Sequence, residues 1–483
     1  MDSLLIASCA FLILMWTWRL LDWVWFKPKK LERYLRQQGL DGNSYRLFYG
    51  DLKERTVMTK KALSTTIKVS DYNVPRVIPY FYHLTQKYGK NSFTWQGPVP
   101  SVIVMDPKLI KEVLSKHDIF QKPFVPIGKL FLQGIHIVPA VHFSCDKMIS
   151  SWEKLLEEGS TELDVKPYLG TLSGDIIARA AFGSNYEEGK KIFELQEEQF
   201  KRLFEVLQSI QAQLPGWRFF PTKTNKRMRE INKEVYTLVK GIIHKREMEI
   251  TKAGDLLGML MDSNSKEIQD NNSKKSGLSI DDIVEECKVF FLAGQETTQL
   301  WLTWVMVLLS SHSYWQTKAR EEVLQVFGKN KPGFDDLNDL KIITMILYEA
   351  LRLYPVASNV TRKVCKTTKL EDMTLPAGVH LVLPIIQVHQ DPQIWGEDAK
   401  EFNPERFSAG VSNASKGQSA FFGFSWGPRI CVGQNFAVME AKLALVMILQ
   451  RFSFQLAPSY THAPMALFNT IPQYGAKLIL QKV

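Results

Sequence analysis

The chain has 483 residues, with 60 Lys or Arg against 50 Asp or Glu, so its formal net charge is +10 at pH 7. A content of 45% hydrophobic and 23% charged residues excludes a disordered chain and a polytopic membrane protein. The five cysteines form no Cys-x-x-Cys pair, which argues against a disulfide framework and a structural zinc site. The positive charge suits an anionic membrane surface, an acidic protein partner or nucleic acid.

The first 26 residues predict a helix that spans a membrane once. Residues 4–16 carry no charged side chain, and apolar character continues to Phe26, so the segment is long enough to cross a bilayer. Four tryptophans lie in its second half, and lysines and arginines dominate the residues that follow. The positive-inside rule therefore predicts that the chain after Phe26 lies in the cytosol. A cleaved signal peptide is disfavoured, because no Lys or Arg precedes the apolar run and no small-residue cleavage site follows it.

Helical periodicity dominates the rest of the chain, and residues 279–310 predict one long helix that crosses the molecule. Ser279 followed by Asp282 resembles a capping box. Near the middle of this segment, the six residues from Ala293 read Ala-Gly-Gln-Glu-Thr-Thr. The hydroxyl of Thr297 can bond the carbonyl of Ala293 and open the helix locally, so that water and a diatomic molecule can lie against it. A simple kink in a core helix is the alternative interpretation.

Two further charged motifs precede the C-terminal region. Glu349 and Arg352 lie three residues apart in a helical pattern and therefore share a face. Taken alone, this pair predicts a solvated ion pair worth less than about 1 kcal/mol. Arg406 follows in the turn Phe-Asn-Pro-Glu-Arg-Phe, and residues 96–105 and 360–388 predict short strands.

The most informative segment is a loop that runs from Phe424 to Gly433 and reads Phe-Ser-Trp-Gly-Pro-Arg-Ile-Cys-Val-Gly. Its glycines allow the backbone to pass close to a flat group. Cys431 stands just before a predicted helix, whose dipole favours the thiolate. Arg429 is two residues away and can meet an anion. The loop also matches the hydrolase motif Gly-x-Ser-x-Gly around Ser425, a remote alternative because no HGGG motif is present.

These segments resemble the cytochrome P-450 monooxygenases in order and spacing. The loop at Cys431 is similar to their haem-binding loop, the segment from Ala293 is similar to their oxygen-binding helix, and the charged motifs are similar to their structural ion triad. The resemblance runs from about residue 30 to the end. Residues 35–53 and 81–123 further resemble the plant group that contains secologanin synthase and terpenoid oxidases.

The resemblance implies a mainly α fold with minor β structure over residues 27–483, preceded by a transmembrane anchor at residues 1–26. It implies a monooxygenase of the endoplasmic reticulum membrane, single-pass and with a cytosolic catalytic domain. Haem b (iron protoporphyrin IX) is the implied cofactor. The implied partners are an NADPH-dependent flavin reductase, an apolar small-molecule substrate such as a terpenoid, and membrane lipid, with no nucleic acid.

The resemblance also assigns roles to individual residues. Cys431 is the implied axial ligand of the haem iron, with Phe424 and Gly433 in the loop around it. Arg429 and Arg362 match positions that meet the haem propionates. The remaining implied roles are proton relay to the bound oxygen by Thr297 with Glu296, and a structural triad of Glu349, Arg352 and Arg406.

One departure from the family pattern is large. Members of the family have a helix with Trp-x-x-x-Arg, whose Trp and Arg touch a haem propionate, between the regions that correspond here to Pro126 and Cys145. This chain passes from Gly134 to His136 without such a helix, so a segment on the order of 30 residues is expected to be missing near 134–136. A splice or gene-model variant with poor haem retention and no catalysis is therefore an alternative, and a haem-dependent isomerase or dehydratase is a further, disfavoured one.

Overall fold

The computed structural model describes residues 2–122, 137–160, 162–214, 216–248, 255–262 and 278–483. Helices dominate these residues and strands are short, which confirms the predicted mainly α fold with minor β structure. The α-helices are α1 (Asp2–Leu21), α2 (Lys27–Gln37), α3 (Leu52–Leu63), α4 (Val74–Val77), α5 (Pro79–Tyr88), α6 (Pro107–Ser115), α7 (Val138–Glu157), α8 (Val165–Phe182), α9 (Tyr186–Leu207), α10 (Lys223–Met248), α12 (Ile280–Ser311), α13 (Ser313–Phe327), α14 (Lys341–Leu353), α15 (Ile385–Val388), α16 (Pro392–Trp395) and α17 (Gln434–Leu449). The π- and 3₁₀-helices are η1 (Asp22–Phe26), η2 (Ile210–Gln213), η3 (Trp217–Phe219), η4 (Asp335–Asn338), η5 (Pro404–Phe407) and η6 (Gly427–Arg429).

The strands form one larger sheet and three small ones within the described residues. The larger sheet has the order β1-β2-β3-β9-β6-β4, and the small sheets pair β10-β13-β5, β11-β12 and β7-β8. The strands are β1 (Asp41–Gly42), β2 (Ser92–Gln96), β3 (Val99–Ile103), β4 (Phe120–Gln121), β5 (Glu162–Asp164), β6 (Val360–Val364), β7 (Thr368–Leu370), β8 (Met373–Leu375), β9 (His380–Leu383), β10 (Phe452–Leu456), β11 (Pro464–Ala466), β12 (Thr470–Pro472) and β13 (Lys477–Lys482).

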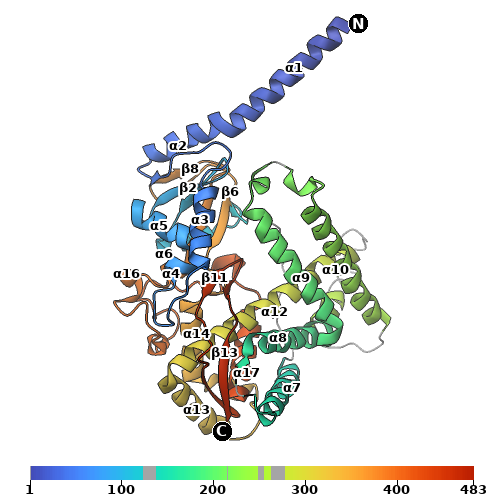
Figure 1. Cartoon of the computed structure of the whole chain (residues 1–483), viewed down its shortest axis with the longest axis vertical. Coiled ribbons are helices and arrows are strands. Elements are labelled where there is room, and N and C mark those ends of the chain that lie inside the picture. The colour runs from blue at the N-terminus through green and yellow to red at the C-terminus, as the bar shows by residue number, and fades with distance from the viewer. Residues whose placement is uncertain (1, 123–136, 161, 215, 249–254, 263–277) are drawn as a thin grey trace.

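The N-terminal helix stands apart from the rest of the molecule. α1, η1 and α2 form one continuous helical run, and α1 points away from the other elements in Figure 1. The stretch from Leu5 to Gln37 is long and apolar enough to cross a membrane, and none of its most apolar window is buried in the protein. An apolar helix that no protein core covers requires another apolar surface, so it is a candidate membrane anchor.

α12 crosses the centre of the molecule and organises the helical part (Figure 1). Ser279 caps it through the predicted capping box with Asp282, so its start agrees with the sequence. It packs against α8, α10, α14 and α17. Gly294 allows the close approach of α8, because a Cβ there would lie 2.5 Å from Ile177 Cγ1.

Candidate haem-binding site

The loop around Cys431 is a tight turn held by backbone contacts. The amide of Cys431 donates a hydrogen bond to the carbonyl of Phe424 at 2.9 Å, which closes the loop before α17 begins. Gly427 has a φ of +71°, and a Cβ there would lie 3.0 Å from the Cα of Ser115 in α6. Glycine is therefore required at this position because the two backbones approach closely.

The thiol of Cys431 is accessible and has apolar neighbours in sequence. Ile430 and Val432 are 49% and 45% exposed, so two apolar side chains flank an exposed sulfur. Although the thiol is accessible, the protein atoms around it remove enough water to raise its pKa above the ordinary value. The Gly433 amide and the charge of Lys122 act in the opposite direction. The expected thiolate preference of the isolated loop is thus outweighed by burial in the free protein.

Three cations gather beside the loop. Burial and the charge of Arg429 lower the pKa of Arg362, on β6, to about 10. Burial lowers the pKa of Lys122, with Arg362 and Arg429 acting the same way and Cys431 acting against them. Clustered cations repel one another unless an anion joins them, so the cluster is suited to carboxylates such as haem propionates. No motif in the sequence marks Lys122, which sequence reasoning missed.

α12 presents Thr297 on the side that faces this loop. Thr297 Oγ1 donates to the carbonyl of Ala293 at 2.5 Å, which confirms the predicted hydrogen bond. One turn later, the ring of Trp301 meets Phe424 edge to face, with centroids 5.6 Å apart. Thr297 and Trp301 are four residues apart and share a helix face. Ala293 is exposed and Thr297 is partly exposed, so this face is accessible at its start, whereas Trp301 is buried.

Glu296, the residue before Thr297, has its carboxyl near Asn469 and Lys166. Burial raises the pKa of its carboxyl, while Asn469 and Lys166 act in the opposite direction. Asn469 lies in the turn between β11 and β12. A raised pKa means that the carboxyl retains its proton at higher pH than a solvated glutamate.

An aromatic cluster lies next to this turn and has no counterpart in the sequence reasoning. Phe468 meets the rings of Phe200 and Phe204 on α9 at centroid distances of 5.0 and 6.1 Å. The cluster joins α9 to the β11–β12 turn that also carries Asn469. Because Phe468 is far in sequence from Phe200 and Phe204, only the tertiary structure brings it to them.

The pair Glu349–Arg352 is buried, so the interpretation as a solvated surface ion pair is wrong. Both side chains are fully inaccessible, and two hydrogen bonds of 2.7 Å join them. The remaining guanidinium donors of Arg352 bind three backbone carbonyls, of His389, Ala399 and Glu401. Complete satisfaction of the donors offsets the cost of burying the charges.

Arg406 joins the pair less directly than the triad implies. Its Nε lies 3.7 Å from Glu349 Oε1, whereas its Nη2 lies 2.7 Å from Asp398 Oδ2. Asp398, which sequence reasoning missed, is therefore the closer carboxylate of Arg406. The cluster has four charged side chains with two of each sign.

The hydrolase alternative lacks its histidine. Ser425 has a strained φ of +68°, as a nucleophile elbow requires, but it is preceded by a turn and followed by η6. The only histidine after it, His462, bonds Tyr354 through Nε2 at 3.0 Å and Tyr460 through Nδ1 at 2.8 Å. Both ring nitrogens are thus engaged, so His462 is not available as a general base for Ser425.

The expected missing segment near 134–136 lies outside the described residues. Trp152, the only tryptophan between Trp95 and Trp217, is fully buried. Its ring packs against Tyr168 and Phe452, with centroids 6.2 and 5.7 Å away. It belongs to the core and does not replace the tryptophan of the expected helix.

The described residues fit a haem in three respects. Cys431 supplies a soft sulfur ligand of the kind that iron binds in haem-thiolate proteins. Ile430 and Val432 provide apolar surface beside the sulfur, which suits a flat macrocycle. The cluster of Lys122, Arg362 and Arg429 provides positive charge for two propionates.

Comparison with known proteins agrees with this site. The family model for cytochrome P-450 matches residues 127–472. The chain is 51% identical over 515 aligned positions to cytochrome P-450 CYP72A219 of Panax ginseng, covering 100% of this chain and 99% of the relative. It is 47% identical over 507 positions to secologanin synthase 1 of Catharanthus roseus, covering 98% and 96%. The chain therefore belongs to the cytochrome P-450 family, whose members are monooxygenases that bind haem b through a cysteine thiolate.

Proposed function

We propose that the chain is a monooxygenase of the endoplasmic reticulum membrane that hydroxylates an apolar small molecule with electrons from NADPH. The observation that carries this proposal is the accessible thiol of Cys431 with apolar neighbours and the cluster of Lys122, Arg362 and Arg429 beside it. Cys431 Sγ would bind the haem iron, and the three cations would meet the propionates. When bound, haem with a thiolate ligand activates molecular oxygen for insertion into a C–H bond.

Thr297 is proposed to deliver protons at the oxygen side. Its hydroxyl donates to the Ala293 carbonyl, so the proton is held at a defined position on an accessible helix face. Rotation of the hydroxyl about the Cβ–Oγ1 bond redirects the proton away from that carbonyl. Glu296 is one residue away, and burial favours its protonated form, so it can serve as the proton source.

The proposed substrate class is terpenoid. Phe200, Phe204 and Phe468 form an apolar cluster next to the turn that carries Asn469, a neighbour of Glu296. Aromatic side chains of this kind suit a large hydrocarbon skeleton. Two relatives are named secologanin synthase, which supports oxidation of a plant small molecule of this class.

The proposed redox partner is an NADPH-dependent flavin reductase. Members of the family use a redox partner, and the net charge of +10 favours the approach of an acidic flavin domain. The anchor at residues 1–26 would place the catalytic domain on the cytosolic face, because basic residues follow it. This topology gives the domain access to cytosolic NADPH.

The second candidate is that this chain is a non-catalytic member of the family that retains haem poorly. The alignment with the Panax ginseng relative has 515 positions, whereas this chain has 483 residues, so at least 32 positions of the relative have no counterpart here. Because almost all of both chains is covered, the gaps are internal, as a missing helix near 134–136 requires.

One experiment separates the two candidates. The full chain is expressed in membranes, reduced and exposed to carbon monoxide, and its absorption spectrum and haem content are measured. A red-shifted Soret band with haem equal to protein supports the monooxygenase. A folded, membrane-bound protein without haem supports the non-catalytic variant and overturns the first proposal.

A further inference from the structure

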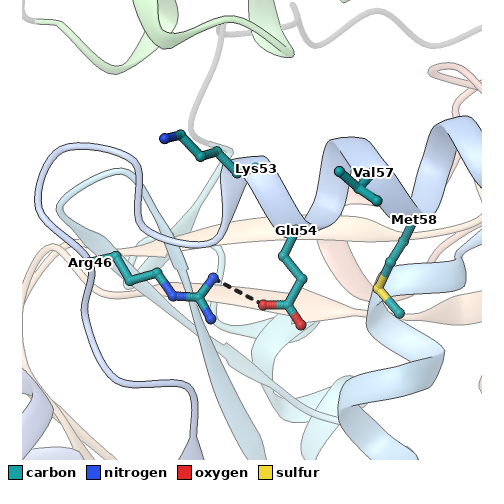
Figure 2. Close-up of a pocket in the computed structure, with 5 residues that line it drawn as sticks. All are labelled: Arg46, Lys53, Glu54, Val57 and Met58. Atoms are coloured by element: carbon teal, nitrogen blue, oxygen red, sulfur yellow. Dashed lines mark hydrogen bonds and ion pairs between the residues drawn. The ribbon is translucent and has the colours of Figure 1, made fainter.

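A shallow groove lies on the N-terminal side of the molecule, away from Cys431. Its volume is about 430 Å³, and it is lined by Arg46, Lys53, Glu54, Val57 and Met58. Figure 2 shows Arg46 on the loop before α3 and the other four residues along α3. The dashed contact in the figure is the ion pair of Arg46 with Glu54, at 3.1 Å.

This groove is joined directly to the end of the candidate membrane anchor. The hydroxyl of Tyr45 donates to the carbonyl of Val24 at 2.7 Å, and the rings of Tyr45 and Trp25 lie 6.4 Å apart. Tyr45 also contacts Trp95 of β2, with ring centroids 4.9 Å apart. The residue before Arg46 is thus fixed to both the anchor and the sheet, so the groove has a defined position beside the anchor.

The position of Val24 determines where the groove lies relative to a bilayer. Val24 is near the end of the apolar run, and Lys27 begins the basic segment that follows. In a single-pass anchor, this transition lies at the level of the lipid headgroups. Tyr45 contacts the anchor at the transition, so the adjoining Arg46 lies at headgroup level.

The groove combines a cationic and an apolar surface, as a phospholipid requires. Lys53 lies over the ring of Tyr49 at 4.2 Å, and among the described residues no carboxylate lies within ion-pair distance of it. Val57 is 66% exposed and Leu47 is 47% exposed. Exposed apolar side chains beside an ammonium group cost free energy in water but not at a membrane surface.

We propose that this groove binds the phosphate of an anionic phospholipid, with Lys53 and Arg46 as its cationic contacts and Val57 against the start of the acyl chains. The inference rests on the proposed membrane placement of residues 1–26. The bound lipid fixes the tilt of the catalytic domain, because the domain then contacts the membrane at two points, the anchor and the groove. Glu54 competes with the phosphate for Arg46.

The test uses the full chain in nanodiscs made from an equal mixture of phosphatidylcholine and phosphatidylserine. The lipid that remains bound after detergent extraction is quantified by mass spectrometry. The double variant Arg46→Ala, Lys53→Ala is expected to lower the enrichment of phosphatidylserine roughly thirtyfold, as two basic residues at a membrane surface predict. Glu54→Gln is expected to raise it, because Arg46 loses its competing carboxylate.

Lys318→Ala is the matched control. Lys318 lies over the ring of Tyr314 at 4.7 Å, which resembles the contact of Lys53 with Tyr49, but α13 is at the end of the molecule opposite the anchor in Figure 1. The control is expected to keep the enrichment of the unmodified chain. Equal enrichment of phosphatidylserine in all variants overturns the proposal, whether the groove is empty or holds a protein. An equal loss of enrichment in Lys318→Ala overturns it as well.

The placement of the anchor is measured separately by flotation with vesicles of phosphatidylcholine alone. All variants are expected to float, because the anchor does not depend on lipid charge. Failure of the unmodified chain to float overturns both the membrane placement and the groove. Normal flotation with unchanged phosphatidylserine enrichment in the variants overturns the groove alone.

Discussion

Trp301 and Phe424 meet edge to face with an interplanar angle of 76°, and this contact joins the central helix α12 to the loop of Cys431. The indole of Trp301 also donates from Nε1 to the carbonyl of Leu347 at 2.8 Å. One side chain therefore connects α12, α14 and the cysteine loop. This connection positions Thr297, one turn away, relative to the sulfur of Cys431.

Cys431→Ser replaces the soft sulfur with a hard oxygen. The red-shifted Soret band of the reduced carbon monoxide complex is expected to disappear, because that band depends on the thiolate. Cys365→Ser is the control, since Cys365 is also exposed but lies outside the loop. Survival of the band in Cys431→Ser would show that another residue is the ligand.

Thr297→Ala removes the hydroxyl that is proposed to deliver protons. The amount of product formed per NADPH consumed is expected to fall and peroxide release to rise, while haem content stays unchanged. Thr303→Ala is a matched control, because Thr303 Oγ1 makes the same type of bond to Gln299, at 2.7 Å in the same helix. An unchanged product ratio in Thr297→Ala contradicts the assigned role.

Glu440 of α17 predicts a pH dependence of stability. Burial raises the pKa of its carboxyl to about 8 from an ordinary value of 4.5, with Ser173 and Thr298 acting in the opposite direction. Between these pH values the folded chain binds a proton that the unfolded chain has lost, so the free energy of unfolding falls as pH rises. The total loss is on the order of a few kcal/mol and is complete above about pH 8.

Urea unfolding across this pH range, with Glu440→Gln alongside, measures the effect. The variant retains the shape of the protonated carboxyl. Above about pH 6.5, its free energy of unfolding is expected to change less with pH than that of the unmodified chain. Burial lowers the pKa of His389 to about 3 and of His462 to about 4, so these residues act in the opposite direction at lower pH in both proteins. Parallel profiles for the two proteins would exclude Glu440 as the titrating group.

The anchor predicts which part of the chain a protease can reach. In intact microsomes, added protease is expected to digest the chain after Phe26, because basic residues retain this side in the cytosol. Detergent-opened microsomes provide the control for protease access. Protection of the catalytic domain in intact microsomes would reverse the proposed topology.

Under the second candidate function, the segment expected to be missing near 134–136 predicts weak haem binding. Two lost contacts to propionates, at roughly 1.5–3 kcal/mol each, weaken binding by about two to four powers of ten. Lys122, which stands beside Arg362 and Arg429, offsets part of this loss. Insertion of a helix with Trp-x-x-x-Arg after Gly134 is expected to restore the ratio of haem to protein. Full haem content and normal turnover of the unmodified chain would contradict this prediction.

The sequence by itself determined the features that depend on neighbouring residues. The capping box of Ser279, the bond of Thr297 to Ala293 and the apolar run up to Phe26 were all predictable. Each is decided within a few residues by helix geometry or by hydropathy, and the tertiary structure leaves these local interactions in place. The order and spacing of the motifs also sufficed to identify the family.

Only the tertiary structure decided which distant residues meet and which are buried. Arg352 has the spacing of a surface pair, but burial beneath the backbone carbonyls of residues 389–401 makes it a core charge. Packing likewise brings Lys122 to Arg429 and raises the pKa of Cys431, although a helix follows the loop. The energy of a charge depends on the water that surrounding segments exclude, and those segments come from distant parts of the chain.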